Sequence, residues 1–127
     1  MTRRKRGFTL TELIISIAII GVLAAVLIPT IGGFIKKARL SADKQDVANV
    51  NRILEIESLE EGFQEPRTIS ELKKIISKHY TDFSFTPRSA SSGYHFIYNT
   101  DTKRLELISE EDWASALGEF NLLAEST

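Results

Sequence analysis

The stretch from Leu13 to Ile28 reads LIISIAIIGVLAAVLI, and it decides how the rest of the chain is interpreted. It carries no charge, and Ser16 is its only polar side chain. Counted from Phe8, the run to Ile28 would form a helix of about 31 Å, close to the hydrocarbon thickness of a bilayer. A chain of 127 residues is too small to surround such a helix on all sides. The pattern therefore predicts a membrane-spanning helix rather than a buried core helix.

Basic residues flank this apolar run on both sides. The tetrad Arg3 to Arg6 precedes it, and Lys36, Lys37 and Arg39 follow it. An excess of Lys and Arg marks the cytoplasmic end of a membrane helix, and the tetrad is the denser group. We therefore expect a single-pass protein of the cytoplasmic (inner) membrane, with its amino terminus inside and its globular part outside.

The composition restricts the function classes. Four of the 16 bases lie in the tetrad, so 12 remain against 17 acids, and this mildly acidic body argues against direct nucleic acid binding. The chain has no cysteine, which excludes disulfides, thiol nucleophiles and cysteine metal sites. The globular part must therefore hold together by packing.

An ordinary signal peptide is the competing interpretation of the amino terminus. It also has a basic stretch, an apolar run and a small-residue cut site, for which Val22-Leu23-Ala24 would serve. Glu12 at the start of the run and the apolar residues that continue past Ala24 count against it. The alternative function is then an exported or membrane-tethered binding module.

The basic leader ends in Gly7, and the segment Phe8-Thr9-Leu10-Thr11-Glu12-Leu13 follows it. This arrangement resembles the leader and helix start of type IV pilins and pseudopilins, which carry a class III prepilin signal sequence. The resemblance implies that a prepilin peptidase cuts between Gly7 and Phe8 and that Phe8 becomes N-methylated. It also implies that Glu12 is the single intramembrane Glu that acts in assembly. A carboxylate in this position costs about 2 to 3 kcal/mol when ionised and unpaired, so such residues are usually paired or functional.

The function implied by the resemblance is structural, not enzymatic: a filament subunit that polymerises through its hydrophobic amino-terminal helix. Its implied partners are the membrane, copies of itself, other pilins, the prepilin peptidase and the pilus assembly machinery. No cofactor and no metal are expected. Surface pilus, secretion pseudopilus and DNA-uptake pseudopilus stay open as filament types, so the location is the cell surface or a periplasm-spanning filament. The region after Gly93 lacks the Asp-Pro-Trp-Gly type of segment associated with major secretion pseudopilins, which counts against the secretion type.

The predicted fold class is α+β, with one long amino-terminal helix packed on a small antiparallel sheet with short helices. The domains are expected at 1–7 (cleaved leader), 8–35 (transmembrane and polymerisation helix) and 36–127 (pilin-like globular domain with the outer half of the helix). The helix should run from Phe8 to about Leu59. Pro29, Gly32 and Gly33 are expected to form a hinge, since proline removes a helical hydrogen bond and glycine weakens a helix.

The globular part shows local patterns of short elements. Thr68 and Glu71 form a capping-box signature before a helix expected at 69–80. Alternation at 94–98 and 104–108 predicts a β-hairpin. Further expectations are a third strand at 83–85, a flexible loop at 87–93, and a last helix capped by Ser109 and Asp112 that carries Trp113, Leu117 and Phe120. On the outer half of the long helix, an apolar stripe should face the sheet (Leu40, Val47, Val50, Leu54), with Lys44, Asp46, Asn51 and Glu55 facing water.

No residue pattern indicates catalysis. His79 and His95 are the only histidines, and their spacing does not suggest a metal site. The acids at 110–112 suit a helix amino terminus. The aromatic residues between Phe83 and Tyr98 are expected in a sheet core rather than as a stacking surface for bases.

Overall fold

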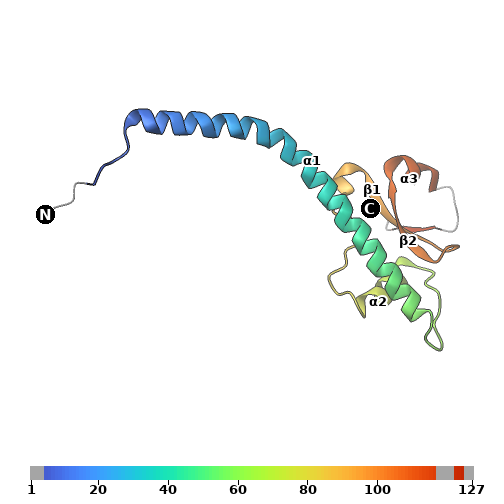
Figure 1. Cartoon of the computed structure of the whole chain (residues 1–127). Coiled ribbons are helices and arrows are strands. Elements are labelled where there is room, and N and C mark those ends of the chain that lie inside the picture. The colour runs from blue at the N-terminus through green and yellow to red at the C-terminus, as the bar shows by residue number, and fades with distance from the viewer. Residues whose placement is uncertain (1–4, 117–121, 125–127) are drawn as a thin grey trace. The chain divides into compact units, whose positions relative to one another are not determined.

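The computed structural model describes residues 5–116 and the backbone of residues 122–124 (Figure 1). The chain divides into two compact units, residues 1–35 and residues 36–127, which are described separately. The elements follow in the order α1 (Leu10–Glu57), α2 (Ile69–Ser77), η1 (Ala90–Ser92), β1 (Tyr94–Asn99), β2 (Arg104–Ser109), α3 (Glu110–Ala116) and β3 (Leu122–Ala124). The predicted α+β class is confirmed.

Helix α1 has 48 residues and is the longest element that the structure describes. It begins two residues after the predicted start at Phe8 and ends two residues before Leu59. Past its end, the amide of Leu59 bonds to the Ile56 carbonyl, and Gly62 adopts a left-handed φ of 88°. Glycine favours this conformation because it has no Cβ to clash, so the chain can turn sharply here.

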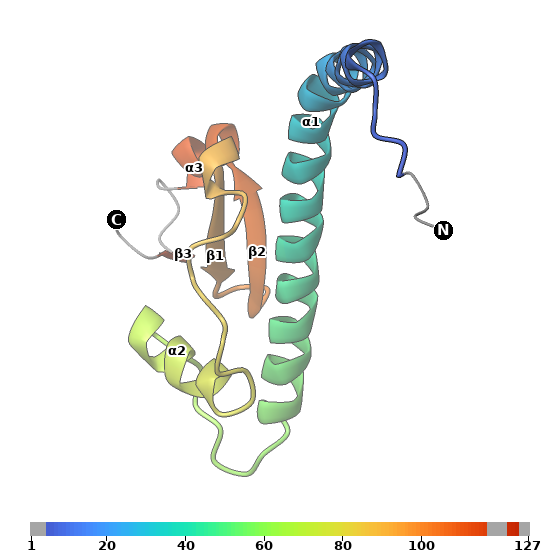
Figure 2. The same ribbon diagram turned by 90° about the vertical axis from the view of Figure 1, so that its left-hand side faces the viewer.

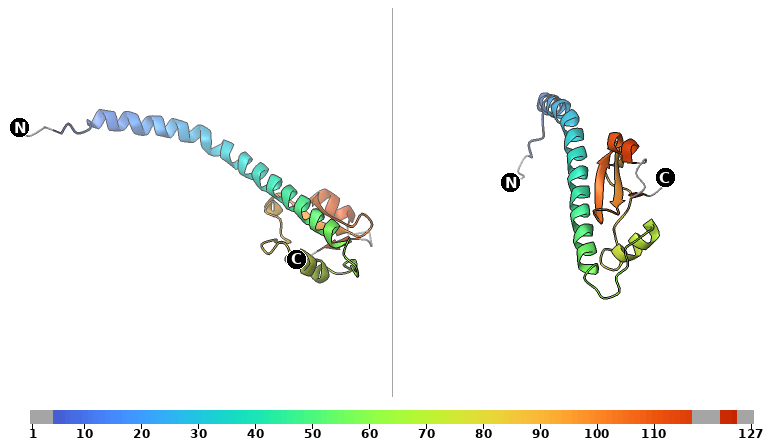
Figure 3. Two further views of the ribbon diagram at one scale, coloured as in Figure 1. Left: turned by 60° about the horizontal axis from the view of Figure 1, so that its bottom comes forward. Right: turned by 90° about the vertical axis from the view of Figure 1, so that its right-hand side faces the viewer.

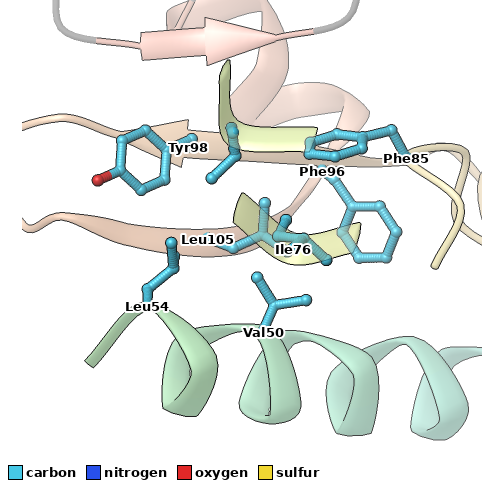
Figure 4. Packing of buried hydrophobic residues seen from close by; sticks show 8 residues of the cluster. Val50, Leu54, Ile76, Phe85, Phe96, Tyr98 and Leu105 are labelled. Carbon is cyan, nitrogen blue, oxygen red and sulfur yellow. The ribbon is translucent and has the colours of Figure 1, made fainter. Parts of the chain in front are cut away.

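The core of the second unit lies between α1, α2 and the sheet. Val50 and Leu54 point from α1 towards Leu105 of β2 and Ile76 of α2, as Figure 4 shows. The other buried members of the cluster are Leu72, Phe85, Phe96 and Tyr98. The predicted stripe is confirmed for Val50 and Leu54, while Val47 and Leu40 are half-buried.

Helix α2 begins at the predicted cap. The Glu71 amide donates to Thr68 Oγ1 at 3.2 Å, and the Glu71 carboxylate accepts from the Arg67 amide at 2.8 Å, one residue earlier than in a regular capping box. The helix ends at Ser77, three residues before the predicted end. Tyr80 still packs on the core from outside the helix.

The sheet has three antiparallel strands in the order β2-β1-β3. The hairpin of β1 and β2 is confirmed, with Phe96 opposite Leu107 and Tyr98 opposite Leu105. The strand predicted at 83–85 is wrong, because β3 occupies the other edge of β1. The segment contributes aromatic side chains to the packing and does not pair through its backbone. The ring centroid of Phe83 lies 5.1 Å from that of Phe85 and 5.5 Å from that of Phe96.

Asn51 joins α1 to the free edge of β2, the strand nearest α1 (Figures 2 and 3). Its side-chain amide donates to the Leu105 carbonyl at 3.0 Å and its side-chain oxygen accepts from the Leu105 amide at 2.7 Å. The prediction that Asn51 faces water is therefore wrong. A primary amide has both a donor and an acceptor, so it pairs with a strand edge as another strand would.

The loop predicted as flexible at 87–93 is held on α1. Asp43, which is 1% exposed, accepts hydrogen bonds from the amides of Arg88 (2.9 Å) and Ser89 (2.7 Å) and from the Ser89 hydroxyl (2.5 Å). Asp46, predicted to face water, accepts instead from the Tyr80 hydroxyl and from Arg88 Nη1. Two carboxylates one turn apart on α1 thus fix the chain that leads into β1.

Helix α3 begins at the predicted cap, with the Ser109 hydroxyl bonded to the Asp112 carboxylate at 2.8 Å. Trp113 stacks on His95 of β1 with 4.6 Å between ring centroids, and His95 Nε2 lies 2.6 Å from Glu110 Oε2. The predicted helix residues Leu117 and Phe120 lie outside the described residues.

The end of α1 carries a buried carboxylate that makes stability depend on pH. Glu57 is 3% exposed and lies 2.9 Å from Lys78 Nζ and 2.7 Å from His79 Nε2. The hydrogen bonds from Lys78 and then His79 lower the pKa of Glu57 below its ordinary value of 4.5, although burial acts in the opposite direction. A lowered folded-state pKa stabilises the fold above the unfolded pKa, and this contribution disappears as the pH falls through the folded pKa.

We therefore expect the free energy of unfolding to fall with the pH below about 4.5, partly through Glu57. Glu57→Gln should lower stability at neutral pH and flatten the acid side of the profile, because the titrating group is gone. Thermal unfolding between about pH 3 and about pH 7 measures this, with Glu55→Gln as the exposed control on the same helix. Parallel profiles for wild type and Glu57→Gln would contradict it.

Candidate processing and assembly site

The peptide bond between Gly7 and Phe8 lies outside regular secondary structure. Residues 5–9 belong to no helix or strand and are exposed, and Phe8 is 94% exposed. A peptide bond in this state is open to attack on both faces, whereas a bond inside a helix would first have to unwind. The local geometry is therefore compatible with proteolysis at this bond.

Thr9 and Glu12 start helix α1 together. The Glu12 amide donates to Thr9 Oγ1 at 3.2 Å, and the Thr9 amide donates to Glu12 Oε2 at 2.8 Å. These reciprocal bonds are a capping box, with Thr9 at the N-cap and Glu12 three residues later. The Glu12 carboxylate thus has a partner within its own chain.

Sequence reasoning missed the role of Thr9. The signature Thr-x-x-Glu was recognised at Thr68 and Glu71 but not at Thr9 and Glu12, although the spacing is the same. Beside the apolar run, Glu12 looks like an isolated charge. The four residues from Thr9 to Glu12 nevertheless carry the capping-box pattern in the sequence itself.

The amino-terminal part of α1 exposes its apolar side chains on every side. It is long and apolar enough to cross a membrane, and its most apolar window has no buried residue. Two of its hydroxyls are satisfied internally, because Ser16 donates to the Glu12 carbonyl at 2.9 Å and Thr30 donates to the Val26 carbonyl at 3.0 Å. Such back-bonding is what a polar side chain needs in hydrocarbon.

The helix continues through the predicted hinge residues Pro29, Gly32 and Gly33. Nothing lies within 4 Å of the position that a Cβ would take at Gly32 or Gly33, so neither glycine is required by packing within the subunit. Among the described residues, no group of His, Cys, Asp and Glu side chains could hold a metal ion. His79 and His95 each pair with a carboxylate instead.

Comparison with known proteins agrees with this geometry. Residues 2–28 match the prokaryotic N-terminal methylation motif. The chain is 33% identical over 75 residues to type II secretion system core protein G of Pectobacterium carotovorum subsp. carotovorum, covering 59% of this chain and 47% of the relative. It is 33% identical over 81 residues to the protein of the same name from Dickeya chrysanthemi, covering 64% and 52%. No solved structure matches the chain.

The chain spans about half the length of the curated relatives it matches. One exposed apolar helix behind a methylation motif, with a small α+β unit after it, fits a protein anchored in the membrane by a single amino-terminal helix. The motif and both relatives support a likeness to type IV pilins and pseudopilins.

Proposed function

We propose that the protein is a structural subunit that polymerises through α1 into a pilus or pseudopilus after prepilin peptidase cleavage between Gly7 and Phe8. The observation that carries the proposal is the exposed apolar helix within the methylation motif. The motif covers residues 2–28, and the large apolar side chains of the helix in that range are exposed. Such a helix needs lipid first and neighbouring helices later.

Each site residue has a proposed role in cleavage or in polymerisation. Gly7 and Phe8 form the cleaved bond, and Phe8 carries the new, methylated amine. Glu12 pairs with such an amine during assembly. Pro29, Gly32 and Gly33 let the helix bend or unwind locally when subunits pack, because Pro29 leaves the Ala25 carbonyl without its helical donor.

The proposed partners are copies of the chain, other pilins, the prepilin peptidase and the assembly machinery in the membrane. Both named relatives are type II secretion proteins, which favours a pseudopilus over a surface pilus. The Asp-Pro-Trp-Gly type of segment is absent after Gly93, so this chain would differ there from a major secretion pseudopilin. The proposed location is the cytoplasmic membrane with the globular unit outside, followed by the filament.

Processing provides the first test. In a host with a prepilin peptidase, mass spectrometry of the membrane fraction should find a chain that begins at methylated Phe8. Ala24→Leu, which removes the small residue of the alternative cut site, should leave that product unchanged. A chain that begins at Ala25 in the wild type and disappears in Ala24→Leu would establish the signal-peptide alternative instead.

A further inference from the structure

Three bases follow the apolar part of α1 directly. Lys36, Lys37 and Arg39 are exposed, and none of them forms an ion pair with any residue the structure describes. The next acid along α1, Asp43, is buried and bonded to Arg88 and Ser89. Within the part of the chain that the structure describes, no carboxylate therefore neutralises their charge.

The three bases lie within one half of the helix circumference. At about 100° per residue, Lys37 lies about 100° around the axis from Lys36, and Arg39 lies about 60° from Lys36 on the other side. They therefore spread over an arc of about 160° within little more than one helical turn. A layer of phosphate headgroups at this level can reach all three charges.

The position of the bases fits the thickness of a bilayer. From Leu10 to Ile35 the helix is about 39 Å long, and a bilayer with its headgroup regions is about 40 to 45 Å thick. The leader bases lie just before this length and Lys36 lies just after it. Lysine and arginine at such positions extend along the helix and place their charges among headgroup phosphates.

We propose that Lys36, Lys37 and Arg39 form a basic collar that binds the phosphates of anionic phospholipids on the outer leaflet. The ligand is a phosphodiester headgroup, and the collar fixes the depth of the helix in the membrane. Leaving the bilayer for a filament then requires these phosphate contacts to be replaced. The inference rests on residence in the membrane and does not depend on polymerisation.

The absence of cysteine allows a direct test on the full, uncleaved chain. Ala38→Cys places a single fluorophore between Lys37 and Arg39, and the protein is reconstituted in vesicles of phosphatidylcholine with a minority of phosphatidylglycerol. The headgroup of one lipid or the other carries a contact-range quencher. Each base near an anionic surface contributes a factor of about five, so quenching by phosphatidylglycerol should exceed its bulk share severalfold.

Variants distinguish an effect of the positive charges from an effect of the particular side chains. Replacing Lys36, Lys37 and Arg39 together by Gln should abolish the enrichment, while Lys36→Arg with Lys37→Arg should keep it. Arg52→Gln, an exposed base farther along α1, should have no effect. Equal quenching by both lipids in the wild type would overturn the proposal, as would an enrichment that survives the triple Gln change. Loss of quenching with inorganic phosphate but not with chloride at equal ionic strength would assign the collar to free phosphate and overturn the lipid assignment.

Discussion

The globular unit, residues 36–127, is expected to fold without the membrane helix and to lose a large part of its stability when Asp43 is replaced by Ala. Three donors converge on this buried carboxylate: the amides of Arg88 and Ser89 and the hydroxyl of Ser89. Ser89 is itself 1% exposed, so water cannot easily replace the lost acceptor. Hydrogen bonds to a charged group contribute about 1.5 to 3 kcal/mol each, and an unsatisfied buried donor costs about 1 to 3 kcal/mol.

We expect Asp43→Ala to destabilise the unit by about 3 to 5 kcal/mol, which is a large part of the total for a domain of this size. Chemical denaturation of residues 36–127, followed by circular dichroism, measures the change. The loss of stability in Asp43→Asn should be intermediate. Asparagine keeps one oxygen that accepts hydrogen bonds, but its NH2 group is itself a donor and faces a donor of the loop. Asp46→Ala is the matched control on the same helix: its partners Tyr80 and Arg88 are partly exposed, so its effect should be smaller. Equal losses for Asp43→Ala and Asp46→Ala would show that burial of Asp43 does not matter.

The features predicted correctly from the sequence are those with short-range causes. The apolar run, the cap at Thr68 and the hairpin between Tyr94 and Ser109 each depend on residues only a few positions apart. The first strand of the hairpin could be assigned because aromatic residues alternate along it. In the turn that follows, the Asn99 side chain accepts from the amides of Asp101 and Thr102, a bond between near neighbours. Local propensity and global packing agree at these places.

The errors share a long-range cause. Asp43 and Ser89 are 46 positions apart, and Asn51 and Leu105 are 54 apart. A polar residue on an amphipathic helix is assigned to the water side by default, and only the tertiary fold shows which of them meets a strand edge or a loop. The 83–85 segment has the alternation of a strand, but its aromatic side chains pack in and against the core while its backbone pairs with no strand.

More of the candidate site than of the fold could be predicted from the sequence, because its residues are close neighbours along the chain. Gly7, Phe8 and Glu12 lie within six positions, so their order along the chain almost fixes their geometry. What the sequence reasoning left out is the hydrogen-bonding state of Glu12, which Thr9 satisfies in the uncleaved chain. On the proposed function, Glu12 would exchange its hydrogen bond from the Thr9 amide for a pair with the amine of a neighbouring subunit.

The largest functional effect is expected for Glu12→Leu, which should still be inserted and cut after Gly7 but should enter filaments poorly. After cleavage, the amine of Phe8 and the carboxylate of Glu12 are four residues apart, and both can also pair between chains. In lipid, an incoming helix with a charged Glu12 gains by meeting the amine of a neighbour, since low dielectric strengthens that attraction. The bond from the Thr9 amide to Glu12 supplies a dipole but no counter-charge, so it does not remove this gain. Leucine has no need of a partner and favours residence in the membrane.

The measurement is the yield of sheared filaments relative to cut subunit in the membrane. An unpaired carboxylate costs about 2 to 3 kcal/mol near the hydrocarbon, so removing the incentive to pair should lower the yield at least about tenfold. Glu12→Asp should be intermediate, because the shorter side chain reaches less far. Thr11→Leu is the matched control: it replaces a neighbouring polar residue by the same apolar one and leaves the bonds between Thr9 and Glu12 in place. Normal filament yield from Glu12→Leu, with cleavage intact, would show that Glu12 is only a tolerated polar residue, and the assembly role would then have to lie elsewhere on α1.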